Sequence, residues 1–481
     1  MANAQAGREM SAFDAFLFRG DDDPRTRAVL AAVYVLDRVP SRERFIASFD
    51  RASRVIVRLR QRVVSPPWPV FLPSWIVDPD FDLDCHLRFA TLPARASLRH
   101  LLEAVQAEVV TPLDTRRPLW EAVLYQGLAG GRAGLLFKMS HAVTDGIGAV
   151  QLFRALFDTE REPEPAPLPP PPIPEDVTPD ELLQSSLARS PWAMMSAAGT
   201  IARTSTRVAA RLVAAPEQSV AAARDYLQSL GRVFAAPAPP SPALAGRSLA
   251  RRLLALEVPL EALKRAGKAA GGSLNDAYLA GASGGLRLYH EQLGQPVDSL
   301  PMAIPVNLRR DDDPAAGNFF GVILLAAPLD IADPRARIAA IGERMRKGRA
   351  EAAIGAPALL APVLARLPDR VRSMLAENAP TPDVQVSNIP ASPVPLHLAG
   401  SLIERAYAFG PVPGVGAMLT LQSIAGTCYI GVNLDPAAFT QPETFAKCLA
   451  AGFEEVLALG GGPARLARPV LGRAAARGSR A

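Results

Sequence analysis

The sequence predicts an α/β protein (α+β in layout) with two domains, because strand-like and helix-like runs alternate in two separate stretches. The first stretch covers residues 13–157, and the second begins at residue 248. Proline-dense breaks at residues 163–174 and 235–242 separate them, and such segments cannot continue as helix or central strand. A chain of 481 residues is long enough for two cores of ordinary size. We therefore expect an N-terminal domain at 1–160, a linker with crossover helices at 161–245, a C-terminal domain at 246–465 and a basic tail at 466–481.

The first stretch begins with a strand and a capped helix. Residues 29–36 are apolar and predict a buried strand, and Ser41 is placed to cap the helix that follows. Residues 80–89 alternate in the manner of a strand, whereas residues 98–109 have helical spacing. Residues 135–139 predict a further strand, after which apolar residues recur at helical spacing.

The second stretch repeats this alternation. Residues 249–258 are strand-like, residues 260–270 are helical, and a longer helix is expected from Asn275 to Tyr289. Residues 302–306 and 322–326 are short apolar runs that predict buried strands.

The longest run without a charge, residues 406–434, is long enough to be considered as a membrane span. Its repeated glycines and prolines favour two strands around a turn, so we predict no transmembrane helix. The first ten residues also lack the apolar core of a signal peptide.

Composition excludes several classes of protein. Hydrophobic residues make up 49% of the chain and charged residues 21%, which is typical of a globular protein. The net charge of +5 suits an anionic substrate or a membrane surface, but aromatic residues are not interleaved with the basic ones as in a nucleic-acid groove. Three cysteines without CxxC spacing predict neither a disulfide nor a zinc site and indicate a reducing compartment.

Arg203, Arg207 and Arg211 are spaced four residues apart, which places them on one face of a helix. That face is either exposed to solvent or lies on anionic lipid.

The most informative segment is Ser140-His141-Ala142-Val143-Thr144-Asp145-Gly146. It places one imidazole where a strand stops and one carboxylate four residues later, where a helix begins. The positive end of that helix disfavours imidazolium, and a neutral imidazole can accept a proton from a hydroxyl. The alternative is that His141 is a histidine of the core. Because adjacent side chains of a strand face opposite sides, Ser140 is expected to point away from the reacting atoms.

Other motifs are weaker. Residues 281–285 fit GxSxG, but they lie inside a helical run, where close helix packing explains the small residues better than a hydrolase elbow does. The acidic runs at residues 21–23 and 311–313 predict solvated turns, and no metal site is expected. The remaining histidines lack ligand spacing and are predicted to be surface or packing residues; they are His86, His100, His290 and His397.

Several segments occur in the order found in one family. They are Pro73-Ser74-Trp75-Ile76-Val77-Asp78 with Phe81-Asp82-Leu83, Thr111 to Glu121 with Pro118-Leu119-Trp120, Ser140 to Gly146, Asn275-Asp276, Pro305-Val306-Asn307-Leu308-Arg309, Gly317-Asn318 and Ser387-Asn388-Ile389-Pro390. Over nearly its whole length the chain resembles the bacterial wax ester synthase/diacylglycerol acyltransferase family, of the chloramphenicol acetyltransferase-like superfamily. The resemblance implies two similar domains, each a mixed sheet flanked by helices, which meet at a channel.

The resemblance also implies roles for individual residues. His141 corresponds to the second histidine of the family's HHxxxDG motif and would be the general base, and Asp145, before Gly146, would hold the loop through an arginine. Arg60, Arg62 and Arg309 are candidates for that arginine. Asn275, next to Asp276, is a candidate donor to the tetrahedral oxyanion, with a helix N-cap as the alternative. The first histidine of the motif is replaced by Ser140, which puts the level of activity in question.

The implied activity is an O-acyltransferase that uses acyl-CoA as a substrate and needs no cofactor, since a thioester is already activated. The acceptor would be diacylglycerol, giving triacylglycerol, or a long-chain alcohol, giving a wax ester. Such substrates imply a cytoplasmic enzyme at the inner membrane or a lipid-droplet surface, without nucleic acid as a partner. Two alternatives are a catalytically weak lipid-binding relative and a condensation-type enzyme that uses carrier-bound acyl thioesters.

Overall fold

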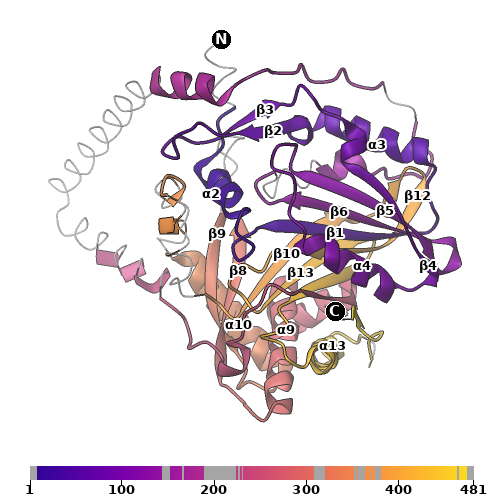
Figure 1. Ribbon diagram of the computed structural model, residues 1–481. Helices are drawn as coiled ribbons and strands as arrows, with labels where there is room; N and C mark the ends of the chain where they lie inside the picture. The colour runs from indigo at the N-terminus through magenta and orange to yellow at the C-terminus, as the bar shows by residue number, and fades with distance from the viewer. Residues whose placement is uncertain are drawn as a thin grey trace, which may run out of the picture.

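The computed structural model describes residues 8–143, 152–164, 167–188, 235–307, 320–351, 381–462 and 465–473, with short pieces of 224–233 and 355–374. Its core is two mixed β-sheets with helices packed on them (Figure 1), as the alternating sequence pattern predicts. Asp145, Gly146, Arg309, the arginines at 203, 207 and 211, and the acidic run at 311–313 lie outside the described residues.

Within the described ranges the first sheet has six strands, of which β4 and β5 pair in parallel and the others pair antiparallel. Its order is β11 (His397–Leu398), β12 (Ser401–Phe409), β1 (Val29–Leu36), β6 (Ala133–Ser140), β5 (Trp120–Leu128) and β4 (Leu87–Ala96). The predictions of strands at residues 29–36 and 135–139 are confirmed. The prediction at residues 80–89 is wrong in its first half, because Leu83–Cys85 forms a 3-10 turn in which Asp82 accepts a hydrogen bond from the amide of Asp84.

The second sheet has seven strands among the residues that the structure describes, and β10 runs parallel to both of its neighbours, β13 and β8. Its order is β15 (Val470–Leu471), β7 (Arg252–Pro259), β14 (Thr427–Leu434), β13 (Ala417–Ile424), β10 (Val384–Ser392), β8 (Ser299–Asn307) and β9 (Phe320–Pro328). A small third sheet pairs β2 (Gln61–Val64) with β3 (Ser74–Val77).

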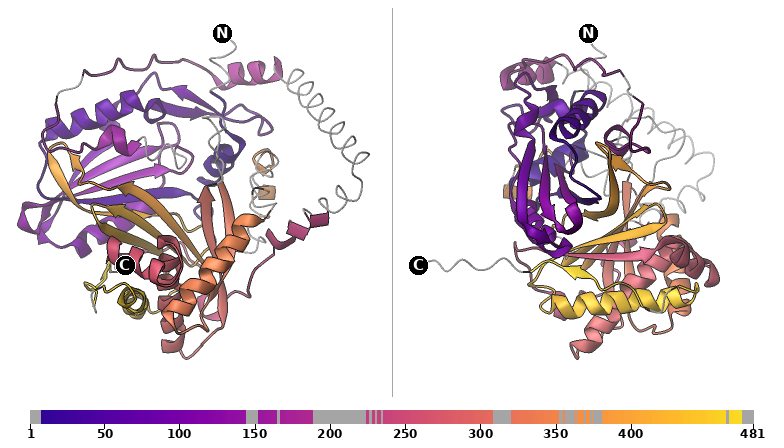
Figure 2. Two further views of the ribbon diagram at one scale, coloured as in Figure 1. Left: turned by 180° about the vertical axis from the view of Figure 1, so that it is seen from behind. Right: turned by 90° about the vertical axis from the view of Figure 1, so that its right-hand side faces the viewer.

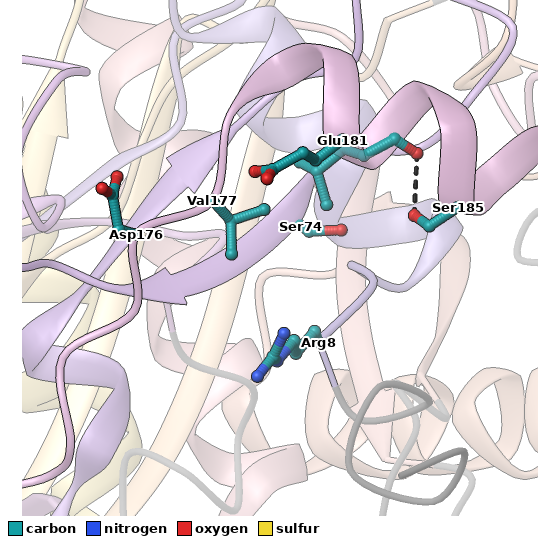
Figure 3. Close-up of a pocket in the computed structure, with 7 residues that line it drawn as sticks. Arg8, Ser74, Asp176, Val177, Glu181 and Ser185 are labelled. Carbon is teal, nitrogen blue, oxygen red and sulfur yellow. Dashed lines mark hydrogen bonds between the residues drawn. The ribbon is translucent and has the colours of Figure 1, made fainter.

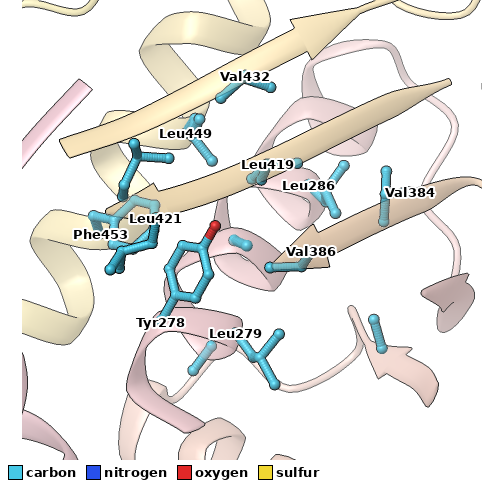
Figure 4. Packing of buried hydrophobic residues seen from close by; sticks show 14 of the residues in the cluster. Tyr278, Leu279, Leu286, Val384, Val386, Leu419, Leu421, Val432, Leu449 and Phe453 are labelled. Atoms are coloured by element: carbon cyan, nitrogen blue, oxygen red, sulfur yellow. The ribbon is translucent and has the colours of Figure 1, made fainter. Parts of the chain in front are cut away.

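The helices cover both sheets. They are α2 (Ala12–Gly20), α3 (Arg42–Val55), α4 (Leu98–Val110), α8 (Leu260–Ala269), α9 (Leu274–Gln292), α10 (Pro334–Ala350) and α13 (Pro442–Ala458). Ser41 caps α3 as predicted, since its side chain accepts the amide of Arg44. The last four helices in this list share one apolar core with the second sheet, and Figure 2 shows them gathered on one side of its strands. In Figure 4, Tyr278 and Leu286 of α9 face Val386, Leu419 and Phe453 across that core.

Strand β12 joins the two halves of the chain. It lies beside β1, with Tyr34 opposite Ala406, so a strand from the C-terminal half completes the first sheet (Figure 1). The hydroxyl of Tyr407 on β12 donates to Glu257 of β7 at 2.7 Å. Strand β12 therefore connects the two sheets, which do not coincide with the two halves of the sequence.

The charge-free run at residues 406–434 forms the end of β12 followed by the hairpin of β13 and β14, so the prediction of strands instead of a membrane helix is confirmed. Ala425 and Gly426 make the hairpin turn with φ values of 46° and 85°, in the left-handed region that tight turns require. Within the described part of the chain, no helix combines the length and apolar character needed to span a bilayer.

Candidate active site

His141 is the first residue after β6, where the sequence predicts that the strand stops. Its backbone N–H donates to the carbonyl of Ala28 at 2.8 Å, which extends the β1–β6 pairing by one bond. The side chain is half-buried, and its Nδ1 is out of contact with solvent. Residues 152–156 are helical, in line with the expected helix after the motif. The strand thus delivers a partly covered imidazole at its end.

Ser140 is fully buried and forms a short polar contact next to His141. Its hydroxyl donates to Oδ2 of Asp21 at 2.5 Å, and its Oγ accepts the backbone N–H of Ala142 at 3.2 Å. Burial raises the pKa of Asp21, although the hydrogen bonds from Ser140 and from the amide of Ala28 act in the opposite direction. The serine is therefore a structural link to a carboxylate from the beginning of the chain.

The prediction of a solvated turn at residues 21–23 is wrong for Asp21 and right for its neighbours. Asp22 is exposed, and Asp23 pairs with Arg25 on the surface. Asp21 was missed because nothing local distinguishes it from the other two aspartates. The available signal was its position directly between an apolar helix and the first buried strand.

The segment Pro118-Leu119-Trp120 supports the base of the motif. The carbonyl of Leu119 accepts the amide of Ser140 at 3.0 Å, and the amide of Trp120 donates to the carbonyl of Pro118. Trp120 is fully buried, donates from Nε1 to the carbonyl of Leu59 at 2.7 Å, and stacks on His86 with 4.5 Å between ring centroids. The buried residues Leu119 and Trp120 thus support the end of β6 from within the core.

Asn275 is the second residue of α9, so the alternative prediction that it caps the helix is wrong. Ser273 is the N-cap, and its Oγ accepts the amide of Asp276 at 3.2 Å. Asp276 accepts the amide of Ser273 in return at 2.8 Å, which completes a capping box. The half-buried side chain of Asn275 is not needed for capping.

Two of the three arginines proposed to hold Asp145 have other partners. Arg60 forms an ion pair with Asp50 at 2.6 Å and also donates to Ser53, while Arg62 lies 3.7 Å from Asp78. Burial lowers the pKa of Arg60. Arg60 thus has a structural role between α3 and the 3-10 turn at Val57–Arg60.

The GxSxG match lies in the middle of α9, with Ser283 fully buried. A Cβ on Gly281 would overlap the ring of Phe453, and one on Gly285 would lie 2.6 Å from Cα of Leu449. The small residues let α9 and α13 pack closely, which confirms the packing interpretation and excludes a hydrolase elbow.

Three of the other four histidines are packing or surface residues, as predicted: His86 and His290 are buried, and His100 is exposed. Burial lowers the pKa of His86 and of His290, and Nε2 of His290 lies 2.7 Å from the hydroxyl of Ser241. His100 accepts the amide of Ser97 and completes the cap of α4. The three cysteines are free, and the described part of the chain contains no cluster of side chains able to hold a metal ion.

A separate pocket of about 240 Å³ lies between the N-terminal segment, β3 and the helix at residues 179–188 (Figure 3). Its lining residues are Arg8, Ser74, Asp176, Val177, Glu181, Leu182 and Ser185. Arg8 is held there by an ion pair with Glu175. Among the described residues, none of those to which the motifs assign a role contributes to this lining.

The two mixed sheets flanked by helices define a fold that acyltransferases share with condensation domains. A wax ester synthase/diacylglycerol acyltransferase from Marinobacter aquaeolei VT8 superposes with a TM-score of 0.60 at 21% identity, covering 90% of this chain and 95% of that one. The starter condensation domain of rhizomide synthetase, solved in complex with C8-CoA and Leu-SNAC, superposes with a TM-score of 0.57 at 15% identity, with 97% of both chains covered.

The chain belongs to the wax ester synthase/diacylglycerol acyltransferase family. The family's catalytic domain matches residues 10–278, and its C-terminal domain matches residues 316–456. A protein of Mycobacterium tuberculosis (strain H37Rv), provisionally named a diacylglycerol O-acyltransferase, is 43% identical over 456 residues, which cover 95% of this chain and 93% of that protein. A second protein of that strain with the same provisional name is 29% identical over 428 residues, covering 85% and 88%. The resemblance found in the motifs is thereby confirmed.

Proposed function

We propose that this enzyme transfers a fatty acyl group from acyl-CoA to the hydroxyl of diacylglycerol or of a long-chain alcohol. Family membership and the 43% identity to a provisionally named diacylglycerol O-acyltransferase support the reaction class. The observation that carries the site assignment is the position of His141, held by its backbone at the end of β6 with its side chain partly covered.

In the proposed reaction, His141 removes the proton from the acceptor hydroxyl, and the oxygen attacks the thioester carbonyl carbon. The tetrahedral intermediate then collapses, the carbon–sulfur bond breaks, and the departing CoA thiolate takes the proton back from the imidazolium. An ester and free CoA result, so no metal and no protein nucleophile take part. A channel between the two domains would bring the two substrates to His141.

Asn275 is the proposed donor to the oxyanion of that intermediate. Its capping alternative has been removed by Ser273 and Asp276, and its side chain lies in the first turn of α9, where the helix end favours negative charge. Asp145 is proposed to hold the loop that follows His141. We further propose that the enzyme works at the inner membrane surface, because both acceptors are membrane-soluble.

The test is a radiolabelled acyl-CoA assay with diacylglycerol or hexadecanol as acceptor, comparing the wild type with His141→Ala. We expect His141→Ala to lower kcat by about 10²- to 10⁴-fold, the usual contribution of a general base. His100→Ala is the matched control, since that exposed histidine caps α4, and its turnover should equal the wild type's. Equal product from wild type and His141→Ala would remove the proposed base.

Two other outcomes correspond to the alternative functions. Ser140 in place of the family's first histidine favours a lipid-binding relative, which would bind acyl-CoA or diacylglycerol without turnover. The similarity in fold to a condensation domain favours an enzyme that makes product only from carrier-protein thioesters and never from CoA.

A further inference from the structure

Asp21, the C-cap residue that follows α2, joins three segments of the chain through one carboxylate. Its Oδ1 accepts the backbone N–H of Ala28 at 2.9 Å, just before β1. Its Oδ2 accepts the hydroxyl of Ser140 at 2.5 Å, at the end of β6. The carboxylate therefore connects the end of α2 with the adjacent ends of two paired strands.

Both partners of Asp21, Ala28 and Ser140, also form hydrogen bonds with the backbone at His141 or next to it. The carbonyl of Ala28 accepts the N–H of His141 at 2.8 Å, and Oγ of Ser140 accepts the N–H of Ala142 at 3.2 Å. Asp21 therefore binds two residues, Ala28 and Ser140, and these in turn accept the amides of His141 and Ala142.

The chemistry of the pair sets the direction of each bond. The hydroxyl of Ser140 donates its single proton to Oδ2 of Asp21, which leaves the lone pairs of Oγ free for the amide of Ala142. Since Ser140 is fully buried, water does not compete for its hydroxyl.

We propose that Asp21 is a positioning residue of this enzyme: through Ser140 and Ala28, its carboxylate sets the backbone of His141 and hence the direction in which the imidazole meets the acceptor hydroxyl. The proposal rests on the proposed function of His141 as base. Its expected effect is large, because displacing a reacting group by about 1 Å can cost about 10²-fold in rate.

The first test is kinetic and uses the full chain. We expect Asp21→Ala to lower kcat about 10- to 100-fold, with the KM for acyl-CoA within about twofold of the wild type. Ser140→Ala should give a similar loss, and the double variant should lose no more than the worse single variant, because the two residues act in one chain of bonds. Asp21→Asn, which keeps the size and one acceptor, should recover part of the rate. Asp22→Ala is the matched control, since Asp22 is the exposed neighbour, and its kcat should not change.

The second test separates positioning from general loss of structure. The chain has five histidines, so ¹³C-histidine NMR gives five ring signals, and the one missing in His141→Ala belongs to His141. In Asp21→Asn and Asp21→Ala we expect only this signal to shift, while those of the buried His86 and His290 stay in place.

Three results would overturn the proposal: an unchanged kcat in Asp21→Ala, additive losses in the double variant, or equal shifts of the His86 and His290 signals. Failure of the proposed function is a different result. Full turnover in His141→Ala would remove the base, whereas the NMR shifts would still report whether Asp21 orients the ring.

Discussion

Gly452 of α13 packs directly on Gly285 of α9, so closely that a Cβ on Gly452 would overlap the backbone nitrogen of Gly285. Gly281 contributes its carbonyl to the same contact. We expect Gly452→Ala to destabilise the protein by about 1–3 kcal/mol, the usual cost of overpacking, because backbone atoms cannot move aside as a side chain can. Thermal unfolding measures this effect. Lys447→Ala, on the exposed side of α13, is the control, and a Tm equal to the wild type's in Gly452→Ala would contradict the close helix contact.

Asn275 and Ser273 should separate catalysis from capping in α9. If Asn275 stabilises the oxyanion, Asn275→Ala lowers kcat by about 10²- to 10³-fold with little change in Tm. Ser273→Ala removes the N-cap and should cost about 1 kcal/mol of stability with kcat retained. Steady-state kinetics and thermal melts of both variants provide the check. A kcat for Asn275→Ala within threefold of the wild type would exclude Asn275 as the donor.

Trp120→Phe should destabilise the first sheet while keeping the aromatic stack on His86. The substitution leaves the carbonyl of Leu59 without the hydrogen bond from Nε1, in a buried place, at a cost of about 1–3 kcal/mol. Urea unfolding measures the loss. Trp68 is 54% exposed, so Trp68→Phe should fall within about 0.5 kcal/mol of the wild type. Equal midpoints for the two variants would show that the indole bond contributes nothing.

Lys138→Met should stabilise the protein at pH 7. The side chain of Lys138 is fully buried, its Nζ lies 3.7 Å from Glu121, and within the described residues it has no hydrogen-bond partner. Glu121 also forms an ion pair with Arg88 at 3.3 Å, and we expect this pair to remain after the substitution. A buried ammonium without a hydrogen-bond partner carries a desolvation cost that an apolar side chain of similar volume avoids, so we expect a higher Tm in Lys138→Met. Lys264→Met, at an exposed ion pair, is the control and should change little.

The pH dependence of Lys138→Met provides a second check. Burial lowers the pKa of Lys138 below its ordinary 10.5, so between the two values the unfolded chain holds more protons than the folded one. Wild-type stability therefore gains from this residue as pH rises through that window, and the advantage of the methionine variant should shrink there. A difference in Tm that stays constant or grows in this range would mean that Lys138 does not titrate as its burial requires.

The spacing of apolar residues predicted the strands and the helix around His141, because these elements are determined by residues that are close in sequence. The strand at residues 29–36, the cap at Ser41 and the strand that delivers His141 all appear where apolar spacing and capping chemistry place them. The alternative prediction that Asn275 caps its helix is wrong by two residues, because Ser273 forms the cap together with Asp276.

Local pattern thus determined by itself the fold class, the family resemblance and the position of His141 at a strand end, because each of these is written in short-range spacing and motif order. Tertiary structure alone decided that Asp21 binds Ser140 and that β12 enters the first sheet beside β1. These contacts join residues more than a hundred positions apart. Their free energy comes from burial and hydrogen bonds that exist only once distant segments meet, so no local property of either partner announces them.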